Sequence, residues 1–318
     1  MTKNKGVCTG ADNSHRARLS AELVRRYHFL KRGVIGQSRC GREIEAFALG
    51  SEEESVLYCG AFHGMEWITS LLLYKYLDCV CAAADRGGCV SQIKLTRFLK
   101  RRGLVVIPCV NPDGVEISLH GAQSAGAYAN LVSHVSGGKT AHWQANAAGV
   151  DLNHNYDAGW EALHKAEQKA GFVSPGPTRF GGKQPESEPE TQAMCAFCRK
   201  NNIHHAVAFH SQGEEIYWHF GEHTPERAGV MATVMARSSG YKKSSPEGLA
   251  VGGGFKDWFI TEFKRRYNAV PATFWVNFQT MTERAQRAGL LYAILKAYKL
   301  AFDFHFNVTV KRWNSVEQ

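Results

Sequence analysis

The stretch that decides the fold covers residues 56–66 and reads VLYCGAFHGME. Its first seven residues form an almost continuous apolar run, which is the pattern of a strand buried on both faces of a sheet. Apolar residues then recur at helical spacing from Glu66 to Ala84, which predicts a helix packed on that sheet. His63 and Glu66 lie at the junction of the two elements. An imidazole and a carboxylate therefore emerge together at the carboxyl end of a strand, where α/β sheets place their functional sites.

Short apolar runs alternate with helical patterns along much of the chain. We predict strands at 55–62, 104–110, 204–210 and 215–220, and helices at 66–84, 186–201 and 225–239. This alternation predicts an α/β protein in which helices cover a sheet. The segment 118–148 is rich in Gly, Ala, Ser and His, and we predict a long binding loop there. No repeat or linker divides the chain, so we predict a polar extension at 1–18 and a single domain at 19–318.

The composition of the 318 residues limits the class of protein. With 44% hydrophobic and 21% charged residues, the chain is neither disordered nor fibrous. The net charge of +9 favours anionic partners, but the basic residues form short separate clusters, so we expect no nucleic-acid binding. Nine scattered cysteines do not form a disulfide framework, and we expect Cys195 and Cys198 to be buried rather than reactive. We see no secretory leader and no uninterrupted apolar span, and therefore expect a cytoplasmic protein without membrane contact.

His210 ends a second predicted strand and supplies a third candidate metal ligand. Two imidazoles and a carboxylate are suitable donors for a catalytic zinc ion, which takes three protein groups and leaves one position for water. Because two strand ends can converge on one ion, we predict one zinc ion per chain, bound by His63, Glu66 and His210. We expect His204 and His205 to be structural, since the first lies near the start of the strand and the second faces the opposite side of the sheet from His210.

Seven blocks of the sequence occur in an order that resembles one family: IGQSRCGREIEAFALG, GAFHGMEWIT, VNPDGVE, NAAGVDLNHNYDAGW, PGPTRFGGKQPESEPET, FHSQGEEIYW and GGGFKDWFI. They resemble the zinc carboxypeptidases, and within them the γ-D-glutamyl-meso-diaminopimelate peptidases that trim bacterial cell-wall peptides. The resemblance implies a three-layer α/β/α sandwich around a mixed sheet of about eight strands. It also implies that His63, Glu66 and His210 bind zinc, and that zinc-activated water hydrolyses the γ-D-glutamyl-diaminopimelate bond.

The resemblance further implies how an anionic cell-wall peptide would bind. In the block GVDLNHNY the family uses Asn-Arg to grip the terminal carboxylate of the substrate, whereas this chain has Asn153 and His154. An imidazole binds a carboxylate more weakly than a bidentate guanidinium does. Lys256 falls where related enzymes shape the pocket for the released residue, and it either pairs with the second carboxylate of diaminopimelate or faces the solvent. Arg179 is a further substrate-binding candidate.

The general base that this hydrolysis requires is missing from its expected place. The resemblance puts a glutamate on a late strand, but the corresponding residue in PATFWVN is Asn277, whose amide cannot accept a proton at neutral pH. The tail after about residue 265 departs from the family pattern, and Glu262 and Glu283 are the nearest carboxylates. Three explanations remain open: a zinc- and peptide-binding protein that has lost hydrolysis, an enzyme with a relocated base, and a disrupted reading frame that replaced the tail.

Two other classes of function are weaker alternatives. Deacylases of small N-acyl amino acids use a related zinc scaffold, but the blocks quoted above favour the cell-wall peptidases. Nucleic-acid binding, which the charge alone suggests, predicts salt-sensitive affinity that survives removal of zinc. The sequence leaves the oligomeric state open.

Overall fold

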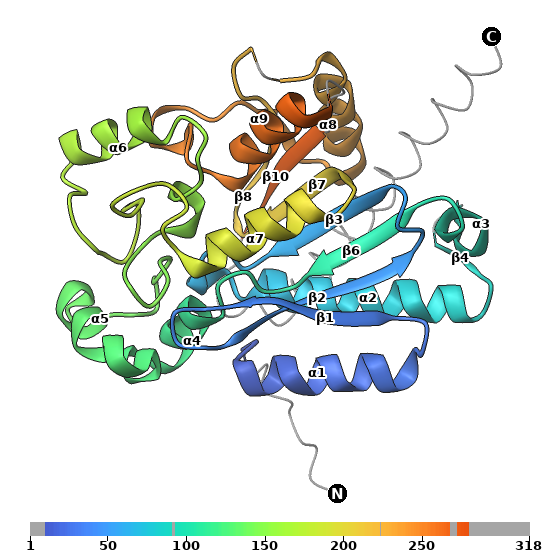
Figure 1. Ribbon diagram of the computed structural model, residues 1–318, viewed down its shortest axis with the longest axis horizontal. Helices are drawn as coiled ribbons and strands as arrows, with labels where there is room; N and C mark the ends of the chain where they lie inside the picture. The colour runs from blue at the N-terminus through green and yellow to red at the C-terminus, as the bar shows by residue number, and fades with distance from the viewer. Residues whose placement is uncertain (1–9, 91–92, 223, 268–271, 280–318) are drawn as a thin grey trace, which may run out of the picture.

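A mixed β-sheet forms the centre of the protein (Figure 1). The computed structural model describes residues 10–90, 93–222, 224–267 and 272–279. Within these residues eight strands form the sheet in the order β1-β2-β6-β3-β7-β10-β8-β9. Their bounds are β1 Lys31–Gln37, β2 Glu43–Gly50, β3 Ser55–Gly60, β6 Gly103–Ile107, β7 Ile203–His210, β8 Gln212–Tyr217, β9 Lys242–Ser244 and β10 Ala272–Gln279.

The four central strands β6, β3, β7 and β10 run parallel to one another. β1 and β2 extend the sheet on one side by antiparallel pairing. On the other side β8 pairs antiparallel with β10 and parallel with β9. Parallel strands need crossover connections, which here are helices on both faces, and this explains why every residue of β3 and β6 is buried.

Two hydrophobic layers, one on each face of the sheet, show that the protein is an α/β/α sandwich. Successive residues of β3 point to opposite faces: Val56 and Tyr58 join one core, whereas Leu57 and Cys59 join the other. The first core contains residues of α1 (Asn13–Arg26), α2 (Ile68–Asp85) and α8 (Glu226–Ser239). The second contains residues of α7 (Pro189–Lys200) and α9 (Phe255–Tyr267). The predicted α/β fold is confirmed.

The remaining elements connect the strands and helices of these layers. Their bounds are η1 Gly64–Glu66, β4 Cys89–Val90, β5 Ile93–Lys94, α3 Leu95–Leu99, α4 Pro112–His120, η2 Ala122–Tyr128, α5 Ala129–Ser136, η3 Leu152–His154, α6 Trp160–Lys169 and η4 Gly248–Ala250. β4 and β5 form a separate two-stranded hairpin. Cys195 and Cys198 are buried in α7, as expected, and are not bonded to each other.

The prediction of a long loop at 118–148 is wrong. This segment contains the end of α4, all of η2 and all of α5. Its few large apolar side chains, Val132 and Trp143 among them, pack with Ile117 and Ala125 into a small core of their own. The sequence did not predict this core, because most of the residues that form it are small or lie far apart in a segment rich in Gly, Ala, Ser and His.

One helix in the described part of the chain, Gly64–Asp85, is long and apolar enough by composition to cross a membrane. More than half of its apolar window is buried inside the molecule, at 56%. Its residues pack against β3 and α1 in the first core, as those of a core helix do.

The first helix begins before residue 19, where the single domain was predicted to start. Residue 18 lies inside α1, which begins at Asn13 with Asp12 as its N-cap, and the Asp12 side chain accepts a hydrogen bond from the backbone N–H of His15. At the other end, β10 continues the sheet beyond residue 265. Glu283 and the helix suggested by the apolar spacing of 290–302 lie outside the described residues.

Candidate functional site

The three predicted metal ligands meet at the carboxyl ends of two neighbouring strands. β3 and β7 are adjacent and parallel, with Gly60 opposite Phe209. His63 and Glu66 follow β3 across a short turn into η1, and His210 is the last residue of β7. One ligand atom from each of the three side chains lies within 4.8 Å of the other two. All three are buried, with 6%, 1% and 1% of their surface exposed for His63, Glu66 and His210.

A single oxygen of the Glu66 carboxylate faces both imidazole rings. Glu66 Oε2 lies 2.8 Å from His210 Nδ1 and 3.3 Å from His63 Nδ1. Among the described residues, His63, Glu66 and His210 form the one group of His, Cys, Asp and Glu side chains whose ligand atoms are close enough to share a metal ion. Two imidazole nitrogens and one carboxylate match the donor set of zinc sites that keep a position open for water. The residues present therefore fit a catalytic zinc ion.

The pKa values within this cluster reflect its buried, paired charges. Burial acts to raise the pKa of Glu66, but the neighbouring His210 and His63 hold it well below its usual range, so the side chain stays a carboxylate. Burial acts to lower the pKa of His63, but the carboxylates of Glu66 and Asp151 raise it to about 10. Burial also lowers the pKa of His210 below its ordinary value, although Glu66 opposes this. An ionised carboxylate is the form of Glu66 that can bind a metal ion.

Asp151 is a further member of the site that the sequence analysis missed. Its Oδ1 lies 3.3 Å from Nε2 of His63, the nitrogen on the far side of the ring from Glu66. Its Oδ2 accepts a hydrogen bond from the backbone N–H of Arg179. Burial acts to raise the pKa of Asp151, but His154 and His63 hold it well below its usual range. A carboxylate in this place orients the imidazole so that its other nitrogen faces the metal site. Asp151 lies in the block GVDLNHNY, but nothing in that block shows that it reaches His63.

The predicted carboxylate-binding pair lies directly beside Asp151. Asp151 is the N-cap of η3, and Asn153 and His154 belong to that single helical turn. Asn153 Oδ1 accepts a hydrogen bond from the backbone N–H of Phe255, whereas its buried Nδ2 has no hydrogen-bond partner among the described residues. Nδ1 of His154 lies 2.6 Å from the carboxylate of Glu167. The structure therefore brings both side chains to the edge of the cluster, with an amide donor left for a ligand.

Lys256 does not face the solvent, so that alternative is wrong. Only 2% of its surface is exposed. Its Nζ donates to the backbone carbonyl of His219 at 2.9 Å, forms an ion pair with Asp257, and lies 5.6 Å from the centre of the Phe220 ring. The amine is thus already engaged by this chain.

Arg179 is exposed and adopts a left-handed backbone conformation with φ of 61°. Its guanidinium carbon lies 5.4 Å from the centre of the Phe172 ring. A non-glycine residue in this conformation is uncommon and usually marks a turn held by its surroundings. Here the hydrogen bond from its backbone N–H to Asp151 holds the turn, which links Arg179 to the cluster through the backbone rather than through its charge.

The residue expected to be the general base lies on the strand next to His210. β10 pairs parallel with β7, and the register sets Asn277 opposite His210; on its other side Asn277 is opposite Glu215 of β8. The carboxylate of Glu262 is held on α9 by Arg199 of α7, at 3.1 Å, and is not a member of the cluster. Position 277 is thus adjacent to a candidate ligand along the backbone, but it carries an amide.

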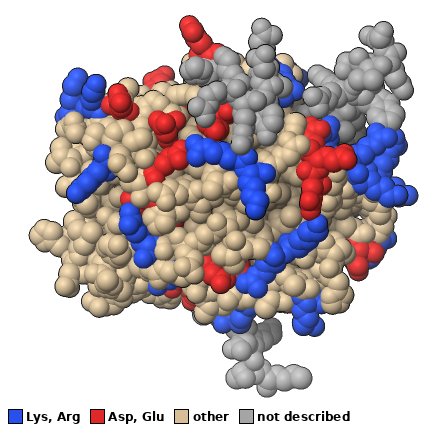
Figure 2. Space-filling model, viewed as in Figure 1, with Lys and Arg blue, Asp and Glu red and all other residues tan. Residues whose placement is uncertain are grey.

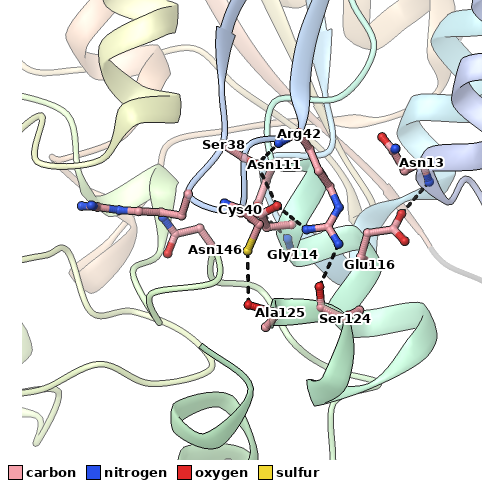
Figure 3. A network of polar contacts seen from close by, with 12 residues as sticks. Asn13, Ser38, Cys40, Arg42, Asn111, Gly114, Glu116, Ser124, Ala125 and Asn146 are labelled. Atoms are coloured by element: carbon pink, nitrogen blue, oxygen red, sulfur yellow. Dashed lines mark hydrogen bonds and ion pairs between the residues drawn. The ribbon is translucent and has the colours of Figure 1, made fainter. Parts of the chain in front are cut away.

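A network of polar contacts joins Asn111 to the turn between β1 and β2 and to the segment around Ser124 (Figure 3). Nδ2 of Asn111 donates to the backbone carbonyls of Phe62 at 3.0 Å and of Gln144 and Ala145 at 3.1 Å. The residue before His63 is thereby tied to the segment that leads to Asp151. In the same network Arg42 reaches from the β1–β2 turn to the backbone carbonyl of Ser124, as Figure 3 shows.

Charged side chains of both signs are interspersed on the face of the molecule shown in Figure 2. Basic residues there occur in small groups beside acidic ones rather than as one continuous patch. The basic residues therefore do not mark a single binding surface on this face.

Comparison with known proteins agrees with this geometry. A family model described as zinc carboxypeptidase matches residues 18–281. The chain is 31% identical over 247 residues to gamma-D-glutamyl-L-diamino acid endopeptidase 1 of Lysinibacillus sphaericus, covering 77% of this chain and 61% of that protein. It is 30% identical over 251 residues to the uncharacterized protein YqgT of Bacillus subtilis (strain 168), covering 77% and 66%. The matched region thus spans less than two thirds of either relative.

A solved structure shows the same fold. Bovine thrombin-activatable fibrinolysis inhibitor, in its complex with tick carboxypeptidase inhibitor, superposes with a TM-score of 0.66. The superposition covers 93% of this chain and 97% of the other at 18% sequence identity.

Proposed function

The chain belongs to the zinc carboxypeptidase family, and we propose that it is a zinc metallopeptidase that hydrolyses the γ-D-glutamyl-diaminopimelate bond of cell-wall peptides. The observation that carries the proposal is the buried cluster of His63, Glu66 and His210 at the ends of β3 and β7. The choice of substrate is supported by the relative from Lysinibacillus sphaericus, whose name specifies a γ-D-glutamyl-L-diamino acid bond.

We assign His63, Glu66 and His210 as the ligands of one zinc ion. When bound, zinc supplies a Lewis acid that polarises the scissile carbonyl and lowers the pKa of a water molecule. Three protein donors leave a position for that water or for the substrate. Asp151 keeps the His63 ring in orientation, and the buried position of all three ligands shields the charges from bulk solvent.

The substrate contacts follow from the placement of η3 beside the cluster. The free amide hydrogens of Asn153 and the imidazole of His154 would bind the terminal carboxylate of the peptide. Lys256 and Arg179 are further proposed contacts for an anionic substrate. Because the Lys256 amine already pairs with Asp257, a substrate carboxylate would have to compete with that partner.

A second function is favoured by one observation: the residue that the strand register sets opposite His210 is Asn277, not a glutamate. An amide cannot take a proton from water or pass one to the leaving amine, so hydrolysis that depends on this position would be lost. On this alternative the chain is a zinc- and peptide-binding protein with impaired catalysis. The two functions share the zinc site and the carboxylate site and differ in turnover alone.

The experiment that separates them uses the zinc-loaded protein and the tripeptide L-Ala-γ-D-Glu-meso-diaminopimelate, with its Lys counterpart for specificity. Release of diaminopimelate by the unaltered chain supports the peptidase. Tripeptide binding without release, together with release by Asn277→Glu at a rate about 10²–10⁴-fold higher, supports the impaired protein. Asn277→Gln is the matched control, since it adds the same length without a base. If the unaltered chain and Asn277→Glu both fail to bind and to cleave the tripeptide, both functions are contradicted.

A further inference from the structure

Glu167 is a buried carboxylate that neither the zinc cluster nor the proposed substrate contacts explain. It lies near the end of α6 and has 0% of its surface exposed. Its Oε1 lies 2.6 Å from Nδ1 of His154, whereas its Oε2 accepts the backbone N–H of Gly181 at 3.3 Å and lies 3.5 Å from Nδ1 of His164. Burying a carboxylate is costly unless cations or several donors surround it. The buried Glu167 carboxylate is therefore compensated by its contacts with His154, His164 and the backbone N–H of Gly181.

The contact with His154 decides which ring nitrogen remains for a ligand. An ionised carboxylate only accepts hydrogen bonds, so the hydrogen between Glu167 and His154 belongs to Nδ1. Nε2 is then the nitrogen left for another partner, and the side chain keeps 12% of its surface exposed. To donate to a substrate carboxylate, Nε2 must carry a hydrogen as well, which makes the ring a cation.

We propose that Glu167 is a positioning residue for the substrate carboxylate: it holds the His154 imidazole through Nδ1 and leaves Nε2 as the donor beside Asn153. The inference rests on the proposed function, because it takes Asn153 and His154 to be the carboxylate-binding pair. In this arrangement an imidazole held by a buried carboxylate takes the place of a guanidinium, whose planar fork needs no such partner.

A purely structural role for Glu167 makes a different prediction. Its second oxygen joins α6 to the backbone at Gly181, so removing the carboxylate could loosen that loop and weaken any ligand without regard to charge. His164 offers the matched control. It contacts the same carboxylate at 3.5 Å, stacks on Trp160, and has no place in the proposed binding machinery.

The test compares Glu167→Gln and His164→Gln with the unaltered chain, all zinc-loaded and full length. Calorimetry measures binding of L-Ala-γ-D-Glu-meso-diaminopimelate and of the analogue whose terminal carboxylate is a carboxamide. We expect Glu167→Gln to weaken the free acid by about tenfold and to leave the carboxamide unchanged, because a charge-assisted bond is lost. His164→Gln should bind both ligands normally. The ¹⁵N signals of the His154 ring should change in Glu167→Gln and stay as they are in His164→Gln.

Each other outcome overturns the inference in a recognisable way. Equal weakening of both ligands in Glu167→Gln, or the same loss in His164→Gln, shows a structural role. Normal binding of the free acid by Glu167→Gln shows that Glu167 does not act on the substrate. If the unaltered chain binds neither ligand, the proposed function fails and the inference fails with it. If the unaltered chain binds the free acid, the results for the two variants test the inference alone.

Discussion

Glu190 shows how the burial of a single side chain sets a pH dependence in this protein. The residue lies in the first turn of α7 and is completely buried. Burial, with the nearby carboxylates of Asp113 and Glu188, raises its pKa from 4.5 to about 7, although the backbone N–H of Arg39 opposes the rise. Asn146 also donates to its carboxylate at 3.2 Å. Within the described parts of the chain no cation pairs with Glu190, because the guanidinium of Arg39 pairs with Glu188.

We predict that Glu190→Gln removes a pH-dependent loss of stability. Between pH 4.5 and about 7 the folded protein keeps a proton on Glu190 that the unfolded chain has released, so raising the pH through this window destabilises the fold. The unaltered chain should therefore lose roughly 3 kcal/mol of unfolding free energy across the window through this group, and the variant should not. Urea unfolding at pH 5 and pH 8 measures the difference. The exposed Glu53→Gln is the control, and parallel pH profiles for Glu190→Gln and the unaltered chain would contradict the prediction.

Single residues also mark how far the site could be predicted. His63, Glu66 and His210 were identified from strand ends and ligand chemistry, and the structure brings them together. Asp151 was not identified, because its contact with His63 joins segments that are far apart in the chain. For the same reason the burial of Lys256 could not be read from its motif, because its amine donates to the backbone carbonyl of His219 in another segment.

Among the secondary-structure elements, η1 is placed by one close backbone contact. A Cβ atom on Gly64 would lie 2.1 Å from the backbone oxygen of Gly114 in α4, a separation that real Cβ atoms do not adopt. Gly64 lies between His63 and Glu66, so the close packing of η1 on α4 also sets the spacing of two proposed ligands.

We predict that Gly64→Ala moves η1 away from α4, lowering the unfolding free energy by about 1–3 kcal/mol and weakening zinc binding. Zinc content after dialysis and the urea midpoint measure the two effects. The control is Gly33→Ala on the edge strand β1, where nothing lies within 4 Å of the added Cβ, and it should change neither quantity by much. Full zinc content and an unchanged urea midpoint in Gly64→Ala would contradict the prediction, because they would show that η1 and α4 can separate without cost.

The predicted elements differ in how well the sequence alone supported them. The strands β3, β6 and β7 were found because their apolar runs are buried along almost the whole strand. β8 ends at Tyr217 and so only partly overlaps the strand predicted at 215–220. The helix α5 was missed because its core is formed with Trp143, a partner outside the helix itself. Periodicity within a short segment cannot report a partner that another segment supplies.

In the molecule as a whole, zinc would join two strands that are distant in the chain. His63 and Glu66 follow β3, whereas His210 ends β7, so bound zinc links the two central strands of the sheet. We predict that zinc at about 100 times its dissociation constant raises the unfolding free energy by about 2.7 kcal/mol, because the unfolded chain does not hold the three donors together.

Thermal unfolding with and without a chelator measures this effect. His210→Ala should abolish the zinc-dependent rise in melting temperature, whereas His204→Ala, on the same strand but nearer its start, should retain it. An equal rise in both variants would mean that zinc stabilises the protein from a different site.

The sequence by itself determined the fold class and the three candidate ligands, because these depend on local patterns: apolar runs, helical spacing, and polar residues at strand ends. The family followed from the resemblance of seven sequence blocks. The tertiary structure alone decided that Asp151 orients His63, that Glu167 holds His154, that Lys256 is buried against Asp257, and that Asn277 is opposite His210. These features depend on how separate segments pack together and, for Asn277 and His210, on the register between strands. The packing of the two cores sets that register, and no single segment carries it.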